Sequence, residues 1–229
     1  MTGVAEPAVR WNRSARAVLV DALSRLPAAA CIVEVQPDEV TVALTSSSRH
    51  GRGADRELAA CGAALSTARV VLRVLGARSR VRFPHDPDRP DVVAALRVRE
   101  PAPATDRDWA RYSALRRITG PAPGTPAPVD TEVLAALARE NDWPRTRVVP
   151  LPPGEPRALR GFGARLLVVT NGDTVDEQIL AGAACHTLRL AAAAHGLKTA
   201  VLIRSAAIGP HAGVAQAVVL VAGPPEGAA

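Results

Sequence analysis

The spacing of apolar residues predicts one long helix in each half of the chain. Between residues 57 and 75, apolar residues recur at steps of three and four and share one helical face: Leu58, Cys61, Leu65, Ala68, Leu72 and Leu75. We expect Asp55 to cap this helix, because its carboxylate accepts a hydrogen bond from a free amide of the first turn. In the second half, Thr174 and Glu177 form a capping-box signature for a helix that runs to residue 195.

Shorter patterns around these helices predict strands and further helices. The runs 31–35 and 40–44 flank a polar turn and predict a β-hairpin. The run DVVAALRVRE predicts a short helix followed by a strand. Other strands are expected at 79–83, 146–149, 164–170, 199–203 and 216–223, and other helices at 15–25, 106–117 and 131–140. The proline-rich stretch 120–128 predicts a semi-rigid connector.

The two long helices align without a gap, which suggests an internal duplication. The matched pairs are Gly62 with Gly182, Thr67 with Thr187, Arg69 with Arg189 and Gly76 with Gly196, and the register continues to Val81 and Val201. Chance similarity between alanine-rich helices is the alternative, but the glycine pairs favour duplication. We therefore expect two half-units, about 10–105 and 106–229, in one domain spanning 1–229. Their Gly/Ala helices should pack together about a pseudo-twofold axis, with a ligand cleft at the interface.

Composition narrows the class of protein. The chain has 229 residues, of which 48% are hydrophobic, too many for a disordered chain. We expect no membrane partner, because no apolar run approaches the roughly 18 residues of a transmembrane helix. The N-terminus lacks an apolar signal-peptide core, which predicts a cytoplasmic protein. Three scattered cysteines favour neither a disulfide framework nor a zinc site, so no metal is expected.

The net charge of +6 comes almost entirely from arginine, since Lys198 is the only lysine. The arginines are scattered among acidic residues and aromatics make up only 3% of the chain, so a nucleic-acid partner is not expected. Compositional bias explains most of this surplus. His186, within the small-residue face of its helix, is expected to be a hydrogen-bonded core or interface histidine rather than a ligand contact.

Three segments, 55–98, 111–137 and 166–202, resemble the Acg-type branch of the nitroreductase superfamily. This branch consists of fused, single-chain versions of the FMN-binding nitroreductase dimer, in agreement with the internal repeat. The resemblance implies an α+β, nitroreductase-like fold with a mostly antiparallel central sheet flanked by helices. It also implies FMN as cofactor, bound between the halves, and FMN-dependent NAD(P)H oxidoreductase activity.

The resemblance also indicates which residues hold the FMN phosphate. The family's basic cluster at the start of the second half is retained in part, as Arg116, Arg117 and Thr119. Gly120 and Pro121 stand where the family has Asn and a last Arg. At the start of the chain, Arg13, Ser14 and Arg16 resemble the phosphate cluster of ordinary nitroreductases.

Two hypotheses follow for the function. The segment 26–35 lacks the Ser, Asn, Gln and Trp residues with which the family contacts flavin. This loss favours a diverged protein with weak or absent FMN binding and impaired redox catalysis, which acts by sequestration or partner binding. The alternative is an active FMN-dependent NAD(P)H oxidoreductase or nitroreductase. The expected ligand is a flavin or another small phosphorylated molecule. The expected assembly is a homodimer or a monomer that mimics a dimer, and no catalytic residue is assigned.

Overall fold

The computed structural model describes residues 11–26, 31–45, 54–118, 128–152, 163–203 and 213–223. The first half of the chain contains α1 (Arg13–Ser24), β1 (Cys31–Val35), β2 (Glu39–Leu44), α2 (Ala54–Val74), β3 (Ala77–Arg82) and β4 (Val92–Pro101). The second contains α3 (Asp106–Leu115), α4 (Thr131–Arg139), β5 (Thr146–Pro150), β6 (Ala164–Thr170), α5 (Val175–Ala194), β7 (Lys198–Ile203) and β8 (Val214–Ala222). Nearly all of the predicted connector 120–128 lies outside the described residues.

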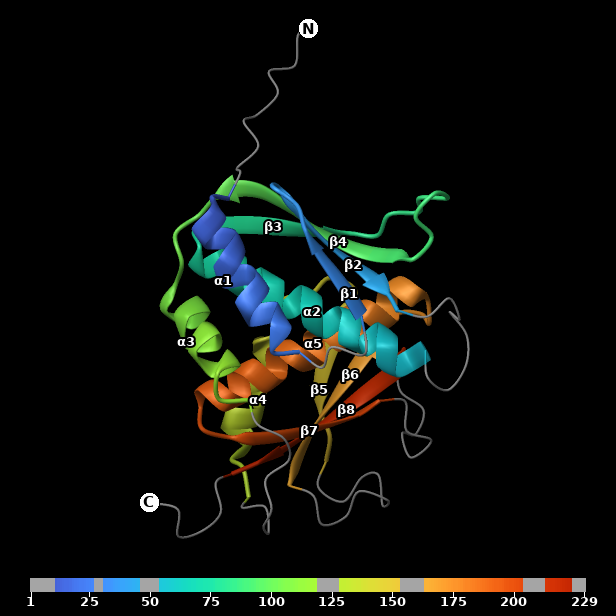
Figure 1. The fold of residues 1–229 in the computed structure, drawn as a ribbon. Helices are drawn as coiled ribbons and strands as arrows, with labels where there is room; N and C mark the ends of the chain where they lie inside the picture. Colours follow the sequence, from blue (N-terminus) through green and yellow to red (C-terminus); the bar gives the residue numbers. More distant parts are fainter. Residues whose placement is uncertain are drawn as a thin grey trace, which may run out of the picture.

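The α+β class is confirmed, but the strands form two sheets. The strand orders are β1-β2-β4-β3 and β5-β6-β8-β7, and every pairing is antiparallel among the described residues. Figure 1 shows α2 and α5 between the two sheets, with the first sheet above them and the second below. This arrangement corrects the expectation of one central sheet flanked by helices. The reason is that most of α5 and much of α2 is buried, and a helix that is apolar on several faces needs cover on each of them.

The two sheets agree in detail as well as in strand order. In the first sheet, the pairing of β2 with β4 shifts register and passes over Val93. In the second, the pairing of β6 with β8 shifts at the corresponding place and passes over Gln216. A β-bulge of this kind is a specific local feature, and here the second and third strands of both sheet orders share one; the first sheet has a further shift between β3 and β4, at Arg78 and Ser79.

Two local predictions are wrong. Residues 91–100 do not begin with a helix, because β4 runs unbroken from Val92 and is paired with β2 on one side and β3 on the other. Burial within the sheet overrides the helix preference of its alanines. Asp55 is not a cap, since α2 already includes Ala54, and its carboxylate lies in the first turn instead. There it still faces the positive end of the helix dipole.

The boundaries of the long helices follow the predicted signals. Thr174 caps α5 and exchanges side-chain and backbone hydrogen bonds with Glu177, which confirms the capping box. Gly76 and Gly196 follow α2 and α5 with φ of +81° and +74°, the left-handed conformation that ends helices. None of the helices in the described ranges is long and apolar enough to cross a membrane.

Candidate functional site

The site is built around the crossing of α2 and α5. A Cβ added at Gly62 would meet backbone atoms of Ile179 and Ala183, and one added at Gly182 would lie 2.5 Å from the Cα of Ala59. Neither glycine has a positive φ, so each is required for space rather than for conformation. The predicted close packing of the two Gly/Ala helices is therefore confirmed.

Two buried hydrogen bonds link the helices next to this crossing. Ser66 Oγ lies 3.0 Å from Thr187 Oγ1, and Thr67 Oγ1 lies 3.0 Å from His186 Nε2. In the aligned helices, Ser66 corresponds to His186 and Thr67 to Thr187. Ser66 therefore bonds the counterpart of Thr67, and Thr67 bonds the counterpart of Ser66. A twofold interface produces this reciprocal pattern. His186 is the hydrogen-bonded interface histidine that was predicted.

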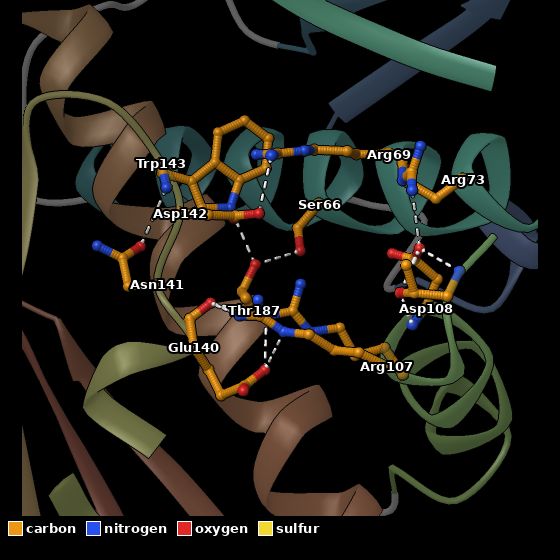
Figure 2. Close-up of polar contacts among 12 residues, drawn as sticks. Ser66, Arg69, Arg73, Arg107, Asp108, Glu140, Asn141, Asp142, Trp143 and Thr187 are labelled. Atoms are coloured by element: carbon orange, nitrogen blue, oxygen red, sulfur yellow. Dashed lines mark hydrogen bonds and ion pairs between the residues drawn. The ribbon is translucent and has the colours of Figure 1, made fainter. Parts of the chain in front are cut away.

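On one side of the crossing, Trp143 fills the space beside Arg69 (Figure 2). Trp143 is only 4% exposed, and its indole Nε1 donates to Thr187 Oγ1 over 2.9 Å. The guanidinium carbon of Arg69 lies 4.6 Å from the centroid of the Trp143 ring system, a cation–π contact. Asp142 accepts a 2.8 Å hydrogen bond from Nη2 of Arg69. The aromatic ring and the carboxylate together satisfy this arginine.

Helix α3 holds the connector that carries Trp143. Figure 2 shows Glu140 at the base of the connector, beside Arg107. Nε of Arg107 and Nη2 of Arg111 donate to Glu140 Oε2 over 2.7 and 2.8 Å, and Arg111 also donates to the Glu140 carbonyl. Arg111 is buried and its bonds to Glu140 are partly shielded from water, whereas the bond from Arg107 is exposed. The first side of the crossing is therefore closed by a fixed structure.

The second side of the crossing contains a cavity of about 230 Å³ between α2, α5, β7 and β8. Its apolar lining consists largely of small side chains, among them Ala59, Ala63, Cys185, Val201 and Ile203. Polar lining comes from one acidic residue, Asp55, and from Arg56, Gln178, His186, Arg189 and Gln216. A mostly apolar cavity with a few polar groups at its wall is typical of a small-molecule site.

Two polar atoms at this cavity have no hydrogen-bond partner in the described part of the chain. They are Nδ1 of His186 and Nε of Arg189, and both are buried. Burial, with a contribution from nearby Arg189, lowers the pKa of His186 to about 3, so the imidazole is neutral at physiological pH. Burial also lowers the pKa of Arg189, although a guanidinium keeps its charge in proteins. Unpaired buried groups are costly, and these two belong to residues that line the cavity.

The connectors that lead to the two sides have the same length but different residues. Six residues join α1 to β1 (25–30), and six join α4 to β5 (140–145). Counted from the helix end, Trp143 corresponds to Ala28 and Arg145 to Ala30. Residues 27–30 lie outside the described ranges. The sequence alone shows that the large side chains of one connector are replaced by methyl groups in the other.

The predicted phosphate ligands lie elsewhere. Arg13, Ser14 and Arg16 are exposed at the start of α1, Arg116 and Arg117 are exposed at the end of α3, and Thr119 lies outside the described residues. None of the five described residues lines the cavity. Sequence reasoning did not identify Arg189 as a lining residue, although the match of Arg69 with Arg189 was the signal that could have found it.

Comparison with known proteins adds no relative. Neither the known protein families nor the curated proteins include a match to this chain. The resemblance to Acg-type nitroreductases therefore depends on the sequence segments quoted above.

Proposed function

We propose that this chain is a diverged, nitroreductase-like protein that binds a small ligand in the cavity beside His186 and Arg189. In this proposal FMN binding is weak or absent, redox catalysis is impaired, and the protein acts by sequestering its ligand or by binding a partner. The observation that carries the proposal is the cavity itself, a mostly apolar space at the helix crossing that is lined by residues of both α2 and α5.

The fused-dimer origin is part of the proposal. It is supported by the identical strand order of the two sheets, by the equivalent bulges and by the reciprocal hydrogen bonds between α2 and α5. Each feature would follow from a homodimer whose two copies became one chain. We infer that a single chain supplies both halves of the interface, so that a monomer mimics a dimer.

The described residues do not fit a whole FMN molecule. A cavity of about 230 Å³ is smaller than the roughly 300–1,000 Å³ of sites for drug-sized ligands. FMN also carries a phosphate, which needs several donors, preferably arginines with bidentate geometry. The arginines proposed for that phosphate, Arg13, Arg16, Arg116 and Arg117, do not line this cavity. These observations favour weak or absent FMN binding.

The second candidate function is that of an active FMN-dependent NAD(P)H oxidoreductase. One observation favours it: the cavity lies between the two half-units, where the resemblance places the flavin of this family. Under this alternative, the phosphate residues proposed from the sequence would contribute to binding from outside the cavity.

A flavin titration separates the two candidates. We expect the purified protein to be colourless and to take up FMN weakly or not at all, measured as retained absorbance near 450 nm after equilibrium dialysis. Replacing both Arg116 and Arg117 by alanine should abolish any residual uptake, with Arg99→Ala as a control that removes an exposed arginine from β4. A yellow protein that NADH or NADPH bleaches would refute the proposal and establish the alternative.

A further inference from the structure

The connector 140–145 lies on the closed side of the helix crossing, and four of its contacts show which groups fill that side. Trp143 lies against Arg69 and donates to Thr187. Two residues further along, the guanidinium of Arg145 lies 3.6 Å from Asp176 Oδ2 and 5.5 Å from the ring centroid of Phe83. A planar ring and a charged group, two residues apart along the chain, thus fill this side.

The counterparts of these contacted residues line the cavity on the other side. In the alignment of the two half-units, Arg69 corresponds to Arg189, Phe83 to Ile203 and Asp176 to Arg56. All three counterparts are lining residues of the cavity. The cavity therefore occupies the position that Trp143 and Arg145 fill on the closed side. In the sequence, Ala28 and Ala30 stand at the connector positions of Trp143 and Arg145.

The charges on the two sides differ in a way that selects the ligand. On the closed side, Asp142 neutralises Arg69 and Asp176 pairs with Arg145. On the open side, an arginine, Arg56, stands in place of the acid Asp176. Within the described residues, neither Arg56 nor Arg189 makes an ion pair. Asp55 also lines the cavity, so the lining carries two arginines and one carboxylate, and this positive balance favours an anion.

We propose that the cavity binds a small planar aromatic anion whose ring lies against the guanidinium of Arg189, as the indole of Trp143 lies against Arg69. The negative group of the ligand pairs with Arg189 or Arg56, and the ligand lies beside His186, which lines the same cavity. The inference rests on the proposed function in one respect only, the use of this cavity. A bicyclic aromatic acid suits about 230 Å³, whereas a dinucleotide does not.

The first test needs no variant. The probe is 2-naphthoate, added to the full-length protein and followed by its fluorescence and by calorimetry. We expect one molecule bound per chain. The saturated analogue decahydronaphthalene-2-carboxylate keeps the charge but has no aromatic ring, so the cation–π contact is lost. 2-Methylnaphthalene keeps the aromatic rings but has no charge, so the ionic contact is lost. Each should bind about tenfold more weakly than 2-naphthoate, or worse. Equal binding of all three compounds, or no binding of 2-naphthoate, would overturn the proposal.

Substitution of Arg189 locates the bound anion. Arg189→Met should weaken 2-naphthoate binding about tenfold or more, and Arg189→Lys should weaken it as well, because lysine keeps the charge but not the planar face. Arg99→Met, a matched loss of an exposed arginine on β4, should leave it unchanged. Thermal unfolding of each variant checks that it is folded. Binding unaffected by Arg189→Met would refute the inference, while the flavin titration would still decide the proposed function separately.

Discussion

Replacing Gly62 by alanine is expected to destabilise the protein by about 3 kcal/mol or more, the upper range for overpacking of a core. The added methyl group would collide with backbone atoms of Ile179 and Ala183 in the facing helix. Backbone atoms cannot avoid the collision by a change of rotamer, as a side chain can, so α2 and α5 would have to separate. That separation would also strain the hydrogen bonds of Ser66 and Thr67. The gain of about 1 kcal/mol in helix propensity from Gly to Ala offsets only part of this cost.

Chemical denaturation measures this effect, and two glycines provide the comparison. Gly182→Ala should be about as harmful, because its Cβ would lie 2.5 Å from the Cα of Ala59. Gly196→Ala is the control: nothing lies within 4 Å of its Cβ, and only its φ of +74° opposes the change. A left-handed alanine costs about 1–2 kcal/mol. The close-packing argument fails if Gly62→Ala is no more harmful than Gly196→Ala.

Trp143→Ala is the second large change and should cost about 3–5 kcal/mol, the usual range for emptying a buried tryptophan position. The indole is nearly fully buried, covers Arg69 and donates to Thr187. Trp143→Phe keeps an aromatic ring but loses the N–H donor, and we expect a smaller loss of about 1–3 kcal/mol. Trp109→Ala, at a tryptophan that is 50% exposed, is the matched control and should have little effect.

Added indole provides an independent measure of the Trp143 cavity. If the space persists in Trp143→Ala, millimolar indole should raise the melting temperature of that variant and leave the Trp109→Ala variant unchanged, since only a ligand for the folded state stabilises it. A Trp143→Ala protein as stable as Trp109→Ala would show that Trp143 does not close this side of the crossing.

Periodicity predicted the elements that depend on local sequence. The steps of three and four in α2, the Thr174 capping box and the hairpin of β1 and β2 all follow from interactions within a few residues. The start of β4 was mispredicted because its alanines favour a helix in isolation, whereas pairing with two neighbouring strands decides their conformation. The division into two sheets could not be predicted, because it depends on how strands distant in sequence pair.

The site was less predictable than the fold. The matched glycines identified the helix crossing, and His186 was placed at its interface. The closure of one side by Trp143 was not visible in the sequence, since it depends on a connector folding back over α2 and α5. The difference between Arg69 and Arg189 emerges only when the two sides of the crossing are compared. The two arginines match in the alignment, but Arg69 lies against Trp143, whereas Nε of Arg189 has no hydrogen-bond partner among the described residues.

The nitrogen shifts of His186 test the location of the ligand most directly. Long-range proton–nitrogen correlation spectra distinguish Nδ1 from Nε2 in a neutral imidazole, and His186 remains neutral because burial holds its pKa at about 3. We expect saturating 2-naphthoate to move the nitrogen signals of His186, which lines the cavity, and to leave those of His195, exposed at the end of α5, unchanged. A ligand that dialysis shows to be bound while both His186 nitrogen signals stay fixed would contradict a site at this cavity.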